Sequence, residues 1–546
     1  MSPRTAPRTT RTDLAPAAAL LAVAVLVALA PALTVLAQLP AALSPAPSSV
    51  TPPESAIAWP SAALILRSFG IALGIAALAT LFAWPAAFAL AFTRRPTAWF
   101  VLTLAPALLP PYLASAAWGL LRAPGTPIGD ALLRAAADGQ TWAPVFAGRV
   151  TAVFALAIWS WPLAAVIIAL RLRETDADAL DAARLEARPR RAALGLLAPP
   201  LTRASIAAAG MLTVLMLGSA IPLHVAQFET VSLRAWTLLT LLPPGQHAAA
   251  WLAAWPAFLA AAFAAVLATR AAVRPSARRI DASHQPRRAL LRSRWPAAAA
   301  LLIWALAVAV PLILFMNALE ELASVPRTLQ LDRDAWLASA RASIAPGLIA
   351  VCITLATWHG LSTGARLARR LTAAAIALLA FTALAPGILI AAAIARFAAV
   401  LPIDPTAWAL AAAHVARFGF VAALLGCALA AVEPAWKRDL RLADGARSLW
   451  ALAASAGPAA IAVPLAAGVL VALLSFHEIE AAVLLTPPGR GALARTLLDR
   501  LHYARQEDLS AACLILAAVA LFVGLLALAA MAAFRPPRAL RGGSSD

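Results

Sequence analysis

Long apolar segments separated by short polar loops dominate the chain between residues 14 and 534. Each is close to or above the ~20 residues that a helix needs to cross the ~30 Å hydrocarbon core of a bilayer. The predicted spans are 14–39, 63–92, 98–121, 150–170, 205–227, 247–269, 295–317, 342–363, 373–395, 407–431, 459–485 and 508–534. Only helices satisfy all backbone hydrogen bonds within such single segments. The pattern therefore predicts an all-α polytopic membrane protein with about 12 transmembrane helices.

The positions of arginine predict the orientation of these spans. Arginines gather at both termini and in alternate loops; segment 171–204 has seven and segment 270–294 has eight. With twelve spans all the basic segments fall on one side of the membrane, which the positive-inside rule identifies as the cytoplasm. We therefore expect a multi-pass protein of the inner (cytoplasmic) membrane with both termini cytoplasmic.

The two halves of the chain repeat each other. Residues 1–269 form the first predicted six-helix half, with polar loop 171–204, and residues 295–546 form the second, with polar loop 432–457; residues 270–294 form a basic cytoplasmic linker. The matched residues are Arg67, Thr80 and Trp84 with Arg341, Thr354 and Trp358 at an offset of 274, and Thr237 with Thr496 at an offset of 259. The change of offset predicts an insertion near 122–149. Equal numbers of spans make the halves parallel repeats.

Composition excludes a soluble protein, because 62% of residues are hydrophobic and only 13% are charged. The net charge of +19 follows from the positive-inside pattern, and no nucleic-acid-binding module is visible, so no nucleic-acid partner is expected. Cys352, Cys427 and Cys513 lie in apolar segments. We expect them to be small core residues, neither disulfides nor metal ligands.

The two polar loops share one spacing. Asp181 precedes Pro200 by 19 positions, and Asp439 precedes Pro458 by the same number. The first loop offers the small residues Ala182, Ala183 and Ala187, which allow another protein to approach closely. In the second loop Gly445 follows Asp444 and permits a sharp exit from a short helix. The matched spacing favours two docking surfaces for a soluble partner; a pair of amphipathic helices on the lipid surface is the alternative.

These loops resemble the EAA loop of the permease subunits of binding-protein-dependent ABC importers, which reads Glu-Ala-Ala, three residues, Gly, and twelve residues to a Pro. Asp181 and Asp439 stand at the Glu position, and Pro200 and Pro458 at the Pro position. The first loop has Ala187 in place of Gly, and the second has Leu440 and Arg441 in place of the Ala pair. The resemblance implies two cytoplasmic ATPase subunits and an extracytoplasmic solute-binding protein as partners.

A second stretch is similar to the end of fused ferric-iron-type permeases. It contains Glu478-Ile479-Glu480, then Pro487-Pro488-Gly489 and His502-Tyr503, and Arg417-Phe418 also suits that group. The resemblance implies ferric iron as the solute, with thiamine, phosphonate, sulfate and polyamine as alternatives. Neither a cofactor nor a resident metal is expected, because the high-affinity ligands would belong to the binding protein.

Transport energy is expected from outside the chain. A phosphate-binding P-loop needs Gly-Lys-Ser/Thr, and the one lysine, Lys437, follows Trp436. We therefore expect no enzyme activity, with ATP hydrolysis in a separate subunit. An ion-coupled secondary transporter, which needs embedded carboxylates in both halves or broken helices, and a membrane scaffold are the rival hypotheses.

Ionisable residues in the predicted spans are candidates for the solute pathway. His477, Glu478 and Glu480 fall in span 459–485, and Arg417 falls in span 407–431. Such groups are costly in a membrane and usually face a cavity or a partner. The alternatives are a structural Glu478–Arg417 pair, or carboxylates in water at the outer interface. His414 is expected to be a packing residue with its hydrogen bonds satisfied.

Overall fold

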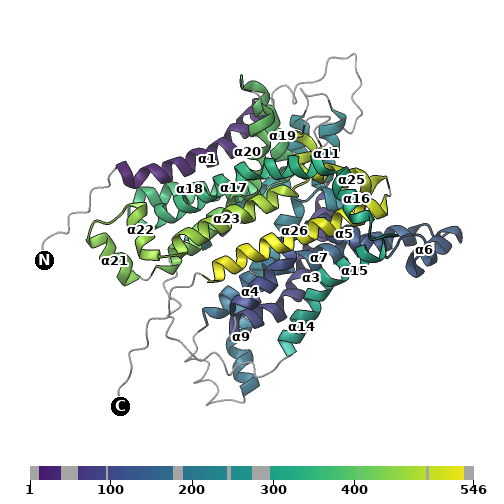
Figure 1. The fold of residues 1–546 in the computed structure, drawn as a ribbon, viewed down its shortest axis with the longest axis horizontal. Coiled ribbons are helices and arrows are strands. Elements are labelled where there is room, and N and C mark those ends of the chain that lie inside the picture. The colour runs from purple at the N-terminus through teal and green to yellow at the C-terminus, as the bar shows by residue number, and fades with distance from the viewer. Residues whose placement is uncertain are drawn as a thin grey trace.

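The protein is a multi-pass bundle of helices (Figure 1). The computed structural model describes residues 11–37, 59–93, 96–175, 189–242, 247–273, 295–403, 405–433, 435–486, 491–503 and 505–533. These ranges contain helices and no strand. Eleven helices are long and apolar enough to span a membrane, and a bent pair makes a twelfth. The predicted fold class is confirmed.

Each half of the chain forms long helices joined by short ones. The first half forms α1 (Arg11–Leu36), α3 (Ala62–Phe92), α4 (Pro96–Leu104), the 3-10 turn η1 (Ala105–Leu108), α5 (Pro111–Leu120), α6 (Pro127–Ala137), α7 (Trp142–Arg173), α9 (Pro189–Leu217), α10 (Ile221–Val225), α11 (Val231–Leu241), α12 (Ala248–Ala253) and α13 (Trp255–Val273). The second forms α14 (Trp295–Trp304), the π-turn η4 (Ala305–Ala309), α15 (Val310–Asn317), α16 (Ser324–Leu331), α17 (Arg333–Ser362), α18 (Arg366–Leu384), α19 (Gly387–Val400), α20 (Pro405–Val432), α21 (Ala435–Ala443), α22 (Leu449–Ala456), α23 (Ala459–Phe476), α24 (Glu480–Leu485), α25 (Leu493–His502) and α26 (Gln506–Ala533).

The helix ends follow the offsets of the sequence repeat. α9 ends at Leu217 and α23 at Phe476, and α10 begins at Ile221 and α24 at Glu480. Both pairs are separated by the 259 residues that the sequence repeat predicts. Helix α6 lies within the predicted insertion, and no helix stands in the corresponding place between α19 and α20.

The core of each half is a group of three packed helices. Helices α3, α7 and α9 pack together in the first half, and α17, α20 and α23 in the second. Small residues allow these helices to approach closely. Where α17 crosses α23, a Cβ atom on Gly347 would lie 2.9 Å from the backbone oxygen of Gly468.

The first helix of each half packs against the other half. Helix α1 packs against α17, α18 and α19, whereas α14 packs against α3. Buried residues of α1, among them Leu20 and Ala24, share a core cluster with Ile376 and Leu379 of α18. The first helix of each predicted unit, 1–269 and 295–546, therefore packs against helices of the other unit.

Several predicted spans are shorter than the sequence pattern suggests. Span 98–121 bends by 75° between Leu108 and Pro111. Span 205–227 is wrong at its end, since α9 stops at Leu217, and span 373–395 is wrong because α18 stops at Leu384. Span 459–485 is interrupted after Phe476. Hydropathy remains high across these breaks, so a count of apolar residues could not locate them.

Prolines account for two of the breaks. Leu109 and Pro110 are extended, with ψ of 145° and 142°. In the corresponding place of the second half Ala385 and Pro386 are also non-helical, with ψ of 159° and 112°. A residue before proline avoids the helical region, and proline itself lacks an N–H. An X–Pro dipeptide thus interrupts a helix in each of the two halves.

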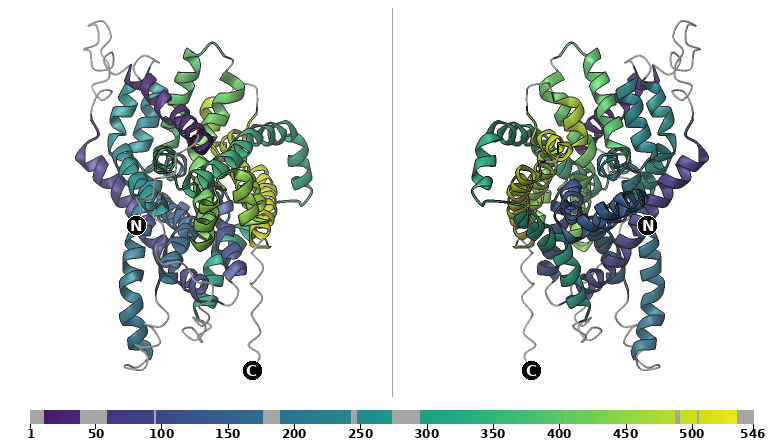
Figure 2. Two further views of the ribbon diagram at one scale, coloured as in Figure 1. Left: turned by 90° about the vertical axis from the view of Figure 1, so that its left-hand side faces the viewer. Right: turned by 90° about the vertical axis from the view of Figure 1, so that its right-hand side faces the viewer.

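The predicted loop 171–204 is shorter in the structure. α7 continues to Arg173, and α9 begins at Pro189, so Pro200 lies inside a helix rather than before one. The first part of α9 extends away from the rest of the bundle (Figure 2). Asp181, Ala182, Ala183 and Ala187 lie outside the described residues, as does linker segment 274–294.

The three cysteines are free thiols. Cys427 and Cys513 are buried, as predicted, whereas Cys352 lies exposed on α17. The prediction of a core position for Cys352 is therefore wrong.

Candidate functional site

Three helix breaks meet in the interior of the bundle. A Cβ atom on Gly218, which follows α9, would lie 2.9 Å from the backbone oxygen of Leu384, at the break between α18 and α19. The third break, 477–479, separates α23 from α24. Each break leaves backbone N–H and C=O groups without helical partners, and in a membrane protein those groups need polar neighbours inside the protein.

Arg417 of α20 donates hydrogen bonds to backbone carbonyls at the end of α18. Its guanidinium donates hydrogen bonds of 3.2 Å to the backbone oxygens of Ala383 and Ala385. It also lies 3.6 Å from the carboxylate of Glu480. Arg417 therefore satisfies carbonyls freed by the break and brings a positive charge to the same place.

Glu480 joins the two halves. One carboxylate oxygen accepts a 3.0 Å hydrogen bond from the backbone N–H of Ala220, which precedes α10. The other faces Arg417, and a Cβ atom on Gly387 would lie only 2.2 Å from it. The carboxylate is buried and fits there because position 387 carries no side chain.

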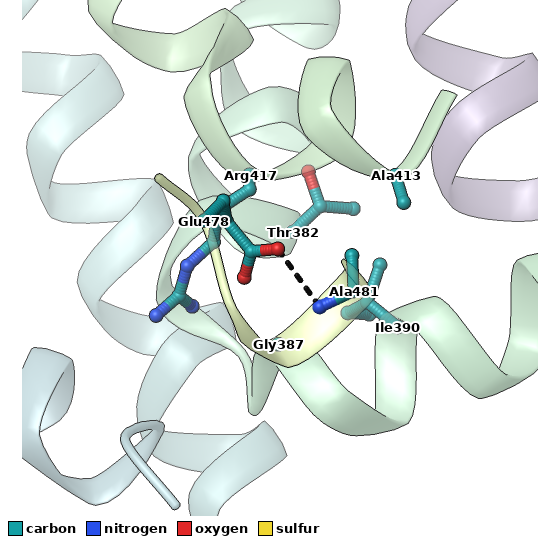
Figure 3. A pocket seen from close by; sticks show the side chains of 7 residues that line it. All are labelled: Thr382, Gly387, Ile390, Ala413, Arg417, Glu478 and Ala481. Carbon is teal, nitrogen blue, oxygen red and sulfur yellow. Dashed lines mark hydrogen bonds between the residues drawn. The ribbon is translucent and has the colours of Figure 1, made fainter. Parts of the chain in front are cut away.

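Glu478 caps the start of α24. It accepts hydrogen bonds from the backbone N–H groups of Glu480 at 2.9 Å and of Ala481 at 2.8 Å. Figure 3 shows its carboxylate directed at Ala481 with Arg417 beside it. The ion pair of Arg417 is with Glu480, so the alternative of a structural Glu478–Arg417 pair is wrong. Placement of the carboxylates in outer water is also wrong, because both are buried.

Two buried histidines lie near these acids. His414 Nε2 is 3.8 Å from a carboxylate oxygen of Glu478, and neither ring nitrogen has a hydrogen-bond partner among the described residues. The expectation that His414 is a satisfied packing residue is therefore wrong. His477 is also buried, and its Nε2 lacks a partner in the same part of the chain.

A small cavity completes this cluster. It is lined by Thr382, Gly387, Ile390, Ala413, Arg417, Glu478 and Ala481. Its volume is about 10 Å³, which is room for about one water molecule. The cluster is closed in this conformation, and a larger solute could enter only if the three breaks moved apart.

The second predicted docking loop folds into helices α21 and α22 at one end of the bundle (Figure 1). Gly445 follows Asp444 and has φ +70°. Its left-handed conformation gives α21 the sharp exit that the sequence predicts. Ser448 caps α22 by accepting from the N–H of Ala451. Gly457, with φ +61°, then ends α22, and Pro458 is the N-cap residue of α23.

The outer face of α21 and α22 combines apolar and acidic residues. The exposed fractions of Trp436, Leu440 and Trp450 are 64%, 57% and 86%. Asp439 of α21 and Asp444, which directly follows α21, are also exposed. We call this set of five residues the α21–α22 face. Exposed aromatic side chains of this kind mark surfaces that contact a protein or a membrane.

A buried ion pair anchors the α21–α22 face. Arg441 lies 2.8 Å from Glu433, and the two side chains are 6% and 5% exposed. Arg441 also donates to the backbone oxygens of Ser362, at the end of α17, and of Ala446. Sequence reasoning missed this anchor, since Arg441 stood out only as a departure from the Ala pair of the loop pattern. The available signal was Glu433, an acid eight residues before it.

Comparisons with protein-family models, curated proteins and solved structures found no match for this chain. Among the described residues, no group of three or more His, Cys, Asp or Glu side chains is placed to hold a metal ion. Function is therefore inferred from the residues and their geometry.

Proposed function

We propose that the chain is the permease subunit of a binding-protein-dependent ABC importer in the cytoplasmic membrane. The observation that carries the proposal is the α21–α22 face, an exposed apolar and acidic surface tied rigidly to membrane helices. In the proposal one ATPase subunit docks there, and a second docks at the segment that contains Asp181 and precedes α9. An extracytoplasmic binding protein delivers the solute.

The contacts of α21 and α22 suggest how an ATPase would move the membrane helices. Arg441 joins α21 to α17 through Ser362 and to the end of α20 through Glu433. α22 leads through Pro458 directly into α23. A displacement of the α21–α22 face would therefore reach α20 and α23, which carry Arg417 and lead to Glu478. Rigid-body rocking of this kind could open the three breaks.

Ferric iron is the solute we propose. The support is the resemblance of the stretch from Glu478 to Tyr503 to ferric-iron-type permeases. The buried acids Glu478 and Glu480 would line the route once the breaks open, with His477 and Arg417 beside them. Thiamine, phosphonate, sulfate and polyamine form the comparison panel in an uptake assay, and undiminished ferric uptake in a deletion strain would count against iron.

Co-purification with an ATPase subunit tests the docking assignment. The test variant carries Asp439→Arg together with Asp181→Arg, and Asp334→Arg at the exposed start of α17 is the matched control for charge reversal. We expect the double variant to lose the ATPase while the control retains it. Retention of the ATPase by the folded double variant would refute the docking assignment.

An ion-coupled secondary transporter is the second candidate function. The interrupted helices and buried carboxylates favour it, because such transporters bind solute and ions at discontinuous helices. The acids belong to one half only: the 259-residue offset pairs Glu478 with Ser219 and Glu480 with Ile221. Uptake by the purified chain alone in proteoliposomes, driven by a proton or sodium gradient, would establish this function in place of the importer.

A further inference from the structure

A basic cavity lies at the edge of the bundle, away from the three helix breaks. It has a volume of about 310 Å³ and lies between the end of α13 and the start of α18. Its lining consists of Val273, Arg366, Arg369, Arg370 and Ala373. Three arginines therefore line one open space that is large enough for a small polar group.

These arginines lack acidic partners in the described part of the chain. Arg369 donates a 2.8 Å hydrogen bond to the backbone oxygen of Val273, and no carboxylate pairs with Arg366 or Arg370 among the described residues. The start of α18, a helix of 19 residues, adds the positive end of its dipole. The cavity therefore concentrates positive charge and offers guanidinium N–H groups that can donate to a ligand.

Apolar residues of the first turn of α18 adjoin the cavity. Leu367, in the same turn as the arginines, is 50% exposed. Ala365 and Ala368 pack against Ala17 of α1, so the opposite face of this turn is closed by protein. A ligand at the arginines thus meets cationic donors at one end and the exposed apolar residues Leu367 and Ala374 along α18. A phosphate group that carries acyl chains has this combination of properties.

We propose that this cavity binds the phosphodiester headgroup of an anionic phospholipid, with the acyl chains along α18. Basic pockets between membrane helices are suited to such headgroups, because guanidinium groups bind phosphate oxygens in pairs. The choice of a lipid over free phosphate rests on the exposed Leu367 and on the position of the arginines at the end of a membrane helix.

The lipid site would adjoin the anchored helix α21. The turn that leads into α18 contains Gly364, where an added Cβ atom would lie 3.2 Å from Leu442 of α21. Arg441 of the same helix donates a hydrogen bond to the backbone oxygen of Ser362, two residues before Gly364. Occupation of the site would therefore stiffen the turn against which α21 packs.

Native mass spectrometry of the full chain tests the site. The protein is titrated in micelles with phosphatidylglycerol, with phosphatidylcholine and with inorganic phosphate. Wild type should hold one phosphatidylglycerol more tightly than phosphatidylcholine. The triple variant R366Q/R369Q/R370Q should bind it on the order of a hundredfold more weakly, from about 1 kcal/mol per arginine near a surface.

Two further variants make the result specific. R327Q/R333Q/R341Q removes three exposed arginines elsewhere in the second half and should bind phosphatidylglycerol like wild type. R366K/R369K/R370K keeps the charge and should retain part of the affinity, which provides a folded variant if the glutamine triple does not fold.

Three results would overturn the proposal. Unchanged lipid binding by the glutamine triple would place the lipid elsewhere. Equal competition by inorganic phosphate would make the cavity a site for the free anion. Loss of a soluble protein partner from the glutamine triple, with lipid binding intact, would make the arginines a protein-docking surface.

Discussion

The carboxylate of Glu480 accepts a hydrogen bond from the backbone N–H of Ala220, which lies 260 residues earlier in the chain. The repeat provides no mirror image of this bond, because the residue that corresponds to Glu480 in the first half is Ile221. A carboxylate of the second half thus accepts a hydrogen bond from the interrupted helix of the first half. The internal symmetry of the protein is therefore broken at the place where its two halves meet.

Removal of this acid should destabilise the protein strongly. Glu480→Ala leaves the buried N–H of Ala220 without its acceptor and leaves Arg417, whose side chain is 18% exposed, without its ion pair. Breaking a fully buried ion pair costs about 3–5 kcal/mol, so we expect a loss toward the lower end of that range. Unfolding of the purified protein in micelles should show that loss. The control is Glu229→Ala, which removes an exposed partner of Arg67 and should cost about 0–1 kcal/mol. Equal effects of the two variants would show that the contacts of Glu480 with Ala220 and Arg417 do not stabilise the protein.

The glycine beside Glu480 should tolerate no side chain. A Cβ atom on Gly387 would lie 2.2 Å from the Glu480 carboxylate, so Gly387→Ala must displace the acid from Arg417. We expect a loss of about 1–3 kcal/mol in unfolding free energy, as for an overpacked core. Gly70→Ala, within α3 and with nothing within 4 Å of the added atom, should be neutral or stabilising. An unchanged Gly387→Ala protein would contradict the packing described for this cluster.

The anchor of α21 should depend on one arginine. Arg441→Gln leaves Glu433 buried without its cation and should lower the unfolding free energy by about 3–5 kcal/mol. It should also make α21–α22 more sensitive to limited proteolysis. Its neighbour Arg438 faces the exposed Asp439 at 3.9 Å, so Arg438→Gln should change stability by no more than about 1 kcal/mol. Similar proteolysis of both variants would remove the anchoring role from Arg441.

Hydropathy predicted the number and placement of the long helices because each must bury its own backbone in lipid. The same signal could not locate the breaks, since Gly218, Ala385 and Ile479 are as compatible with an apolar segment as their neighbours. The X–Pro pairs at Pro110 and Pro386 were the visible clue. They became decisive only when both halves were seen to break at the same place.

The cluster itself was predictable in part. Glu478, Glu480 and Arg417 stood out as ionisable residues in apolar segments, and the structure brings all three together. Sequence alone did not reveal which acid meets Arg417, because the two carboxylates are only two positions apart. The loop pattern likewise located Gly445 as a helix end but missed the bond from Arg441 to Ser362. That bond joins residues 79 positions apart in the chain.

The region around His247 should respond to mild acid. His247 accepts a 2.8 Å hydrogen bond from Arg396 at Nδ1, and its Nε2 donates to the backbone oxygen of Leu242 at 2.9 Å. Burial, and secondarily the charge of Arg396, lower the pKa of His247 below its usual value, while the bond to Leu242 opposes the shift. A lowered pKa in the folded state means that the neutral ring contributes stability above about pH 6.5, the ordinary value for histidine. That contribution is lost as the pH falls through the lowered pKa.

Melting temperatures measured between pH 8 and pH 4 should therefore decline below about pH 6.5 in the wild type, where the unfolded chain begins to take up the proton that the folded ring resists. In His247→Gln the side chain can still bond Arg396 but cannot titrate, so the part of the decline that belongs to this site should disappear. Arg396→Gln removes the cation that a charged ring would face, and it should reduce the decline without abolishing it. Identical pH profiles for wild type and His247→Gln would show that the pair is not a source of acid sensitivity.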